Sequence, residues 1–153
     1  MHNAITSHRL PALTSFFGES FLLHLLWENL QAPLFAGFES YGQHFWICFK
    51  AAWGDLLFMF VIYAGLAIVH RNPFWLTDRA AYAHPATWIA VLLIGIVLSV
   101  GCELWAVYVD HRWQYTEAMP LIPVLQIGLT PVLQMILIPL AVVSFSSRFS
   151  RLP

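Results

Sequence analysis

Four apolar stretches, each close to 20 residues long, dominate this chain of 153 residues. An α-helix needs about 20 consecutive apolar residues to cross the hydrocarbon layer of a membrane. Charged residues make up only 10% of the chain, against about 25% in a soluble domain. We therefore expect an all-α integral membrane protein, a four-helix bundle forming a single membrane domain over residues 1–153. The expected spans are about 13–35, 45–69, 87–109 and 120–145.

The charge and the cysteines exclude several classes of protein. Seven Lys and Arg residues against eight Asp and Glu residues give a net charge of −1, so no nucleic-acid partner is expected. Two isolated cysteines exclude a disulfide scaffold and a Cys-rich zinc module. Arg9 precedes the first apolar stretch as it would in a signal peptide, but Glu19 and Glu28 lie inside that stretch. We expect the first span to be retained.

The basic residues predict the orientation in the membrane. With four spans, both termini and the 70–86 linker lie on one side, which holds five Arg residues, whereas the other side holds one Lys and one Arg. By the positive-inside rule, both termini are cytoplasmic. The prediction is a multi-pass protein of the cell inner (plasma) membrane. The five residues are Arg9, Arg71, Arg79, Arg148 and Arg151, and the two are Lys50 and Arg112.

Polar residues inside the spans are costly, and their positions form a pattern. At 3.6 residues per turn, five polar or aromatic residues of the first span fall within about 100° of one another. The second span contributes Asp55 and the third Glu103, and three residues of the fourth repeat every four positions. Glu28, Asp55, Glu103 and Gln126 lie roughly 8–15 Å below the outer interface at 1.5 Å per residue. The five residues of the first span are Ser20, His24, Trp27, Glu28 and Gln31. The three residues of the fourth span are Gln126, Thr130 and Gln134.

Two interpretations of this layer remain open. Interhelical hydrogen bonds commonly hold membrane bundles together, and the Gln126–Thr130–Gln134 stripe fits that role as well as it fits a ligand site. Three acids and a histidine at one depth are harder to explain as structural bonds, because each charge makes the next more costly to ionise. The layer therefore predicts a functional pocket inside an apolar bundle.

The residue types in this layer indicate acid–base chemistry. At least one of Glu28, Asp55 and Glu103 is expected to be neutral at pH 7, and a neutral carboxyl beside an ionised one is an acid–base pair. We expect Glu28 and Glu103 to be the acid and the base, Asp55 to tune them and His24 to orient Glu28. The pocket opens into lipid, so the expected substrate is an apolar, isoprenoid-type lipid, and aromatic faces would stabilise a carbocation.

The residues expected to bind the substrate come from three helices and one loop. Trp113 and Tyr115 lie in the 110–119 linker, which is either an interfacial loop or a lid over the pocket. The expected set is Trp27, Gln31, Trp105, Trp113, Tyr115, Gln126, Thr130 and Gln134.

Residues 103–134 resemble a segment of the small membrane lycopene cyclases and carotenoid hydratases, in which an acid is followed by W-x-Y and a proline-led helix ending in Gln. The matching residues are Glu103, Trp113, Tyr115 and Gln134. The paired acids after the proline in those cyclases are Val132 and Leu133 here, a departure that counts against cyclase activity itself.

A second resemblance concerns the first two spans. His24-Leu-Leu-Trp-Glu28 is similar to the H-x-x-x-E of the sterol isomerase (emopamil-binding) superfamily. Gly54-Asp55-Leu56-Leu57 is similar to a GD-containing helix there, although the helix order differs. Both resemblances imply isomerisation, cyclisation or hydration of isoprenoid or sterol lipids. No cofactor is expected.

Two other classes of function remain. His24 and Glu28, at i and i+4, could ligate a metal, although the Glu-x-x-His pairs of di-iron bundles are lacking, so no metal ligand is assigned. A non-enzymatic protein that binds a lipid, or that assists assembly of a partner membrane protein, fits the same pocket without catalysis.

Overall fold

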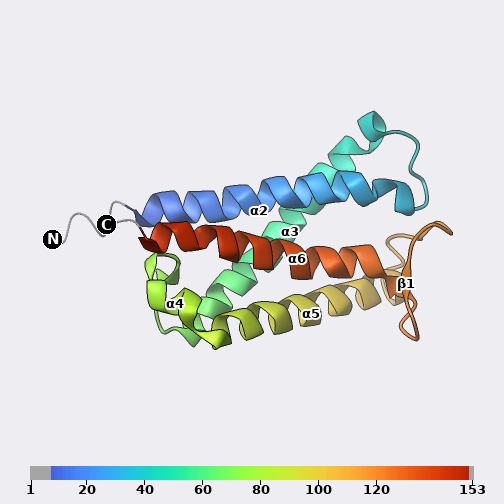
Figure 1. Ribbon diagram of the computed structural model, residues 1–153. Coiled ribbons are helices and arrows are strands. Elements are labelled where there is room, and N and C mark those ends of the chain that lie inside the picture. The colour runs from blue at the N-terminus through green and yellow to red at the C-terminus, as the bar shows by residue number, and fades with distance from the viewer. Residues whose placement is uncertain (1–7, 152–153) are drawn as a thin grey trace.

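The computed structural model describes residues 8–151, and its regular structure is almost entirely helical. Four of the described helices are long, and they run side by side along the molecule (Figure 1). The elements in chain order are α2 (Arg9–Gln31), η1 (Ala32–Leu34), α3 (Tyr41–Val69), η2 (Trp75–Thr77), α4 (Arg79–Ala83), α5 (Pro85–Tyr108), β1 (Leu121–Ile122), β2 (Ile127–Gly128), α6 (Leu129–Ser146) and η3 (Ser147–Arg151).

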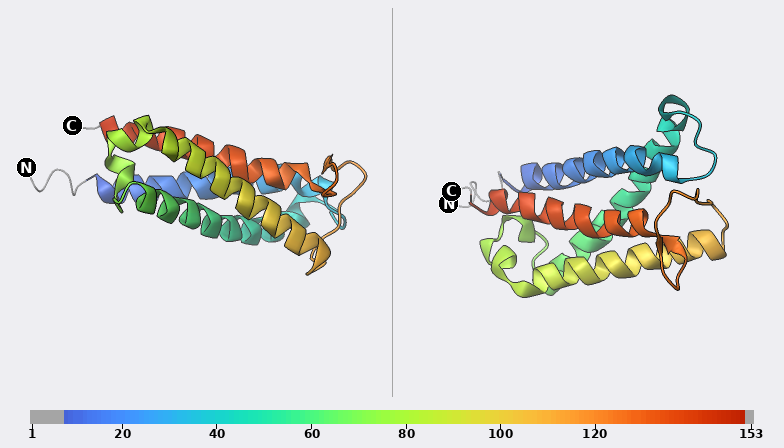
Figure 2. Two further views of the ribbon diagram at one scale, coloured as in Figure 1. Left: turned by 90° about the horizontal axis from the view of Figure 1, so that it is seen from below. Right: turned by 45° about the vertical axis from the view of Figure 1, so that its right-hand side comes forward.

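The four long helices pack in two opposed pairs. Helix α2 packs against α3 and α6, and α5 packs against the same two helices from the other side. In Figure 1, α6 (red) lies between α2 (blue) and α5, and α3 crosses behind them at an angle. The turned views in Figure 2 show the same arrangement. Helices α5 and α6 approach closely at Gly95, where an added Cβ would lie 2.5 Å from the carbonyl oxygen of Met135.

Three helices are long and apolar enough to cross a membrane, by length and composition. They are α3, α5 and the continuous segment Leu129–Ser150, formed by α6 and η3. These helices indicate a membrane protein. The second and third apolar stretches are thus confirmed as helices, within four residues of their predicted bounds. Helix α2 has the length but falls short in hydropathy, because polar residues such as Glu19, His24 and Glu28 lie along it.

The prediction that the fourth helix begins near residue 120 is wrong. Residues 120–128 instead form a short antiparallel pair, in which Leu121 pairs with Gly128 and Ile122 with Ile127. Pro120 and Pro123 have no N–H for a helical hydrogen bond, and Val124 and Gln126 adopt positive φ values of 72° and 53°. The chain is therefore not purely α-helical in its described part. Helix α6 starts only after Gly128.

The two ends of the molecule differ in charge and structure. At the end that we name the basic end, α2 begins, α6 ends, and η2, α4 and η3 pack together; it carries Arg9, Arg71, Arg79 and Arg148. At the opposite end, named the distal end, α3 and α6 begin and β1 and β2 lie (Figure 1). Arg148 forms an ion pair with Glu19 and donates to Ser15 Oγ at 2.9 Å, which ties η3 to α2.

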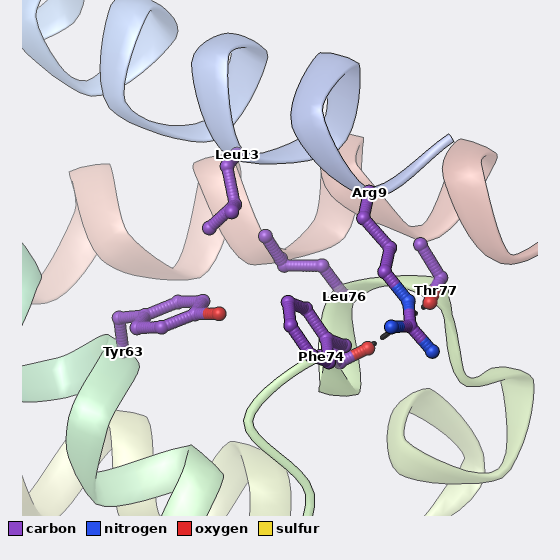
Figure 3. A pocket seen from close by; sticks show the side chains of 6 residues that line it. All are labelled: Arg9, Leu13, Tyr63, Phe74, Leu76 and Thr77. Carbon is purple, nitrogen blue, oxygen red and sulfur yellow. Dashed lines mark hydrogen bonds between the residues drawn. The ribbon is translucent and has the colours of Figure 1, made fainter. Parts of the chain in front are cut away.

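A small pocket opens at the basic end (Figure 3). The guanidinium of Arg9 lies over the ring of Phe74, with Cζ 4.1 Å from the ring centroid, a cation–π contact. The Thr77 hydroxyl donates to the Phe74 carbonyl below it. These contacts hold the segment before α4 against the first turn of α2.

The interior differs in composition between the two ends of the molecule. Toward the basic end, Phe16, Met59, Ile62, Trp75 and Val142 form a fully buried apolar core from three helices and η2. Toward the distal end, buried polar side chains from all four long helices lie among the apolar ones. Thr87 and Ser146 are buried polar residues at the basic end, so buried polar groups are not confined to one half. The buried polar residues of the distal half are Ser20, His24, Gln31, Asp55, Ser99, Glu103 and Gln134.

Candidate functional site

The candidate site is a buried hydrogen-bonded network that joins α2, α3 and α6. The polar stripe of α2 faces inward as its periodicity predicts, since Ser20, His24 and Gln31 are buried. Asp55 reaches the same place from α3, and Gln134 reaches it from α6. One helical turn repeats every 3.6 residues, so residues 20, 24, 28 and 31 share one face of α2.

Gln134 is the centre of this network. Its Nε2 donates to Asp55 Oδ2 at 2.9 Å and lies 3.0 Å from His24 Nδ1. Its Oε1 accepts from Gln31 Nε2 at 2.9 Å. A single amide of α6 is therefore bonded to α2 twice and to α3 once.

Gln31 extends the network to a carboxyl group and to an indole ring. Its Nε2 donates to Glu28 Oε1 at 3.0 Å as well as to Gln134. Its Oε1 accepts from Trp27 Nε1 at 3.2 Å. Gln31 thus holds the Glu28 carboxyl on the same helix.

His24 makes its polar contacts with Asp55 and Gln134. Its Nδ1 lies 3.3 Å from Asp55 Oδ2, and the side chain is fully buried. No hydrogen bond joins His24 and Glu28 among residues 8–151. The structure therefore gives no direct contact for the expected role of His24 in orienting Glu28. The side chains of positions 24 and 28 diverge, because His24 points to α3 and α6 while Glu28 is drawn to Gln31.

Glu28 is close enough to both Asp55 and Glu103 to interact with each of them electrostatically. The Glu28 carboxyl interacts with the charge of Asp55 and, more weakly, with that of Glu103. These groups come from α2, α3 and α5. Since like charges in a low-dielectric interior oppose each other, all three cannot be ionised without a large cost.

Glu103 is held by the loop between α5 and β1. The Tyr115 hydroxyl donates a hydrogen bond to Glu103 Oε2. Burial raises the pKa of the Tyr115 phenol, and the hydrogen bond to Glu103 raises it further, so the phenol keeps its proton at neutral pH. Tyr115 is therefore a hydrogen-bond donor that caps Glu103 from the distal side.

The loop that carries Tyr115 folds back over the end of α2. Phe35 forms an isolated antiparallel bridge with Tyr115, and the amide of Ala36 donates to the Gln114 carbonyl at 2.9 Å. The Phe35 ring packs edge-on against Trp113, with ring centroids 6.1 Å apart. Trp113 Nε1 is buried beside Glu103 and Tyr115. This arrangement favours the lid interpretation of the loop.

Replacing Tyr115 by phenylalanine is expected to lower the free energy of unfolding by about 1–3 kcal/mol, since Glu103 Oε2 would lose its donor in a buried place. Equilibrium unfolding in mixed micelles measures this difference. Tyr41→Phe is the matched control, because Tyr41 is 56% exposed, and it should change stability by less than about 0.5 kcal/mol. Equal effects of the two substitutions would contradict the capping role.

Three predicted site residues lie elsewhere. Gln126 is exposed in the turn before β2, because residues 120–128 do not continue the helix of Gln134. Trp105 is 59% exposed on α5, outside the buried network. Thr130, on the first turn of α6, is half-buried and its hydroxyl donates to Met119 Sδ at 3.3 Å. The predicted Gln126–Thr130–Gln134 stripe is therefore wrong as a unit.

Two contributors were not predicted for the site. Phe35 packs on both aromatic residues of the loop, and its position just after η1 gives no periodic signal. Cys48 is buried beside the site and its thiol donates to the Glu28 carbonyl at 3.5 Å. Cys48 shares a helix face with Asp55, seven residues later, and this spacing could have identified it.

An apolar groove lies between α2 and α6 on the outer surface, beside the network. Trp27 belongs to both features, since its ring lines the groove while its Nε1 donates to Gln31. Leu26 and Leu30 are more than half exposed at the rim. The groove-lining residues are Leu23, Leu26, Trp27, Leu30, Leu137, Ile138 and Ala141.

In the described part of the chain, no group of three or more His, Cys, Asp or Glu residues could hold a metal ion. His24 is bonded to Gln134 and Asp55, while Glu28 is bonded to Gln31, so the two do not converge on one point. The alternative of an intramembrane metal site therefore has no set of ligands in this structure.

No protein-family model, curated protein or solved structure matches this chain. The interpretation of the site consequently depends on its geometry and chemistry.

Proposed function

We propose that the four long helices form a membrane-spanning bundle, with both termini in the cytoplasm, in the cell inner (plasma) membrane. Three helices have the length and hydropathy of membrane spans. Support for α2 as the fourth comes from its contacts with α3 and α6 and from its outward face, where Leu10, Leu22, Leu26 and Leu30 are exposed. The arginine residues of the basic end support the orientation.

We further propose that the protein carries out acid–base chemistry, an isomerisation, cyclisation or hydration, on an apolar isoprenoid-type lipid. The observation that carries this proposal is the convergence of Glu28, Asp55 and His24 on one buried network, bonded through Gln134 and bordered by a lipid-facing groove. Structural cross-linking needs hydrogen bonds but does not need several acids, and acids are the costly choice within a membrane.

The proposed roles follow the contacts. Glu28 and Glu103 act as the acid and the base, because they flank the network from α2 and α5 and each has a carboxyl oxygen fixed by a donor. Asp55 tunes the two carboxyl groups from α3, where it is bonded to Gln134. The groove beside Trp27 takes the apolar chain, and the indole face stabilises positive charge that develops on it.

The second candidate is a non-enzymatic protein that binds a lipid or a partner membrane protein. It is favoured by the completeness of the network, since Gln134 joins three helices and would stabilise the fold without any reaction. This candidate uses the same groove but needs no proton transfer.

The lipid extract of cells that make Glu103→Gln distinguishes the two candidates. If Glu103 transfers a proton, the amide abolishes the transfer, and the product should fall at least tenfold while the substrate accumulates. Glu117→Gln is the matched control, because Glu117 is exposed in the 109–120 loop; its extract should equal that of the wild type. An unchanged extract for Glu103→Gln at full protein abundance would rule out catalysis by Glu103 and favour the second candidate.

A further inference from the structure

The hairpin formed by residues 120–128 presents an apolar tip that the rest of the protein does not cover. Leu121, Pro123 and Val124 are exposed there, and Val124 is 93% exposed. Val124 also has a φ of 72°, in the left-handed region where a β-branched side chain is strained. Glycine would adopt this conformation without that strain, so the turn itself does not account for a valine.

The two loop segments of the distal end differ in polarity. The segment that follows α5 carries Asp110, Arg112 and Glu117, and Arg112 forms an exposed ion pair with Asp110 at 2.7 Å. By contrast, residues 118–147, which include the hairpin and the whole of α6, contain no charged residue. Turns that face water are polar as a rule. The first segment therefore has the composition of a loop in water, whereas the hairpin does not.

The contacts of the hairpin place it at the depth of a membrane interface. The Tyr108 hydroxyl, at the last residue of α5, donates to the Leu125 carbonyl at 2.8 Å. Tyr108 and Trp105, one turn earlier, are both more than half exposed, as aromatic residues at membrane interfaces are. The apolar segment that follows the hairpin, Leu129–Ser150, has 22 residues and is about 33 Å long, close to the thickness of the hydrocarbon layer. The hairpin therefore lies at the edge of that layer.

The backbone of the hairpin suits an apolar surrounding. A chain that enters lipid must satisfy its polar backbone groups within the protein. The amide of Gln126 donates to the Ile122 carbonyl at 2.9 Å, and the amide of Leu129 donates to the Pro120 carbonyl at 2.8 Å. Pro120 and Pro123 have no N–H that would need an acceptor. The turn thus needs fewer hydrogen bonds from water than an ordinary loop.

We propose that the hairpin 120–128 inserts its tip into the lipid leaflet on the distal side, with Leu121 and Val124 as the side chains that enter it. The occupant of this surface is lipid, because the hairpin continues directly into α6, a helix with the length and hydropathy of a membrane span. Burial of the valine side chain in lipid offsets the strain of its backbone. This role of the hairpin goes beyond the proposed function and needs no reaction at the buried network.

The test is the collision of a nitroxide spin label with two relaxation agents, measured by electron paramagnetic resonance. The full chain carries Cys48→Ala and Cys102→Ala, is labelled at Val124→Cys and is reconstituted in phosphatidylcholine liposomes. Oxygen concentrates in lipid, whereas nickel ethylenediaminediacetate stays in water. The label should collide more often with oxygen than with the nickel complex. A label at Leu121→Cys should do the same, and it serves as the second position if Val124→Cys does not fold.

Two labels on the same background are the controls. Gln114→Cys is exposed in the polar segment at the same end of the molecule, so the order of the two collision rates should be reversed there. Leu93→Cys is the lipid reference, because Leu93 is 56% exposed in the middle of α5. Its label should favour oxygen.

More collisions with nickel than with oxygen at Val124 would place the tip in water and overturn the proposal. Few collisions with either agent would also overturn it, since the tip would then be covered by protein, a second copy of the chain included. Failure of the membrane-spanning bundle gives a different result, because the Leu93 label would then favour nickel. A label that favours oxygen at Leu93 but nickel at Val124 removes only the insertion of the hairpin.

Discussion

Gln134→Leu is expected to lower the free energy of unfolding by about 3 kcal/mol, the largest effect of any single substitution in the buried network. Leucine has nearly the volume of glutamine but removes one hydrogen bond each from Gln31, His24 and Asp55. An unsatisfied buried polar group costs about 1–3 kcal/mol, and measured bonds between membrane helices lie at the lower end of this range. About 3 kcal/mol corresponds to a change of roughly 150-fold in the folding equilibrium.

The measurement is reversible unfolding in mixed micelles or bicelles, where the wild type and the variant are compared at equal protein-to-detergent ratio. Gln114→Leu is the matched control, because Gln114 is exposed in the loop after α5 and its backbone contact with Ala36 does not need its side chain. It should change stability by less than about 0.5 kcal/mol. A similarly small effect of Gln134→Leu would mean that the network does not hold the helices together.

Gly95→Ala is expected to destabilise the protein by about 2 kcal/mol. The added Cβ would lie 2.5 Å from the Met135 carbonyl oxygen, a backbone atom of α6 that cannot move without the helix. Overpacking of this kind costs about 1–3 kcal/mol, and the better helix propensity of alanine offsets less than 1 kcal/mol of it. Small residues at such positions allow membrane helices to approach closely.

Gly101→Ala provides the comparison within the same helix. No atom lies within 4 Å of the Cβ position of Gly101, so alanine should raise stability by up to about 1 kcal/mol. The two substitutions are chemically identical and should act in opposite directions, which unfolding in the same micelles measures. If both stabilise, the close approach of α5 and α6 is not present in the folded protein.

The membrane helices and the polar face of α2 could be predicted because each depends on a local pattern. Runs of about 20 apolar residues gave α3 and α5 to within four residues. The 3.6-residue period placed Ser20, His24 and Gln31 on one buried face of α2. Asp55, Glu103 and Gln134 were expected to be inside because polar groups avoid lipid, and all three are buried.

The start of α6 and the exposure of Trp105 could not be predicted from the same patterns. Residues 120–128 are as apolar as a helix, but two prolines and two positive φ values turn the chain there, and Gln126 leaves the stripe. Trp105 lies two residues after Glu103, so it points to a different side of α5. Apolar character alone does not tell a lipid-facing aromatic residue from one that lines a pocket.

The amino-acid sequence by itself determined the apolar helices α3 and α5 and the face of α2 that its polar residues share, since these properties depend on neighbours along one helix. Only the tertiary structure decided that Gln134 bonds to Gln31, His24 and Asp55, and that Tyr115 caps Glu103. Such pairings depend on how each helix is rotated and crossed against the others and on how the loops return. Periodicity along a single helix contains no information about that rotation.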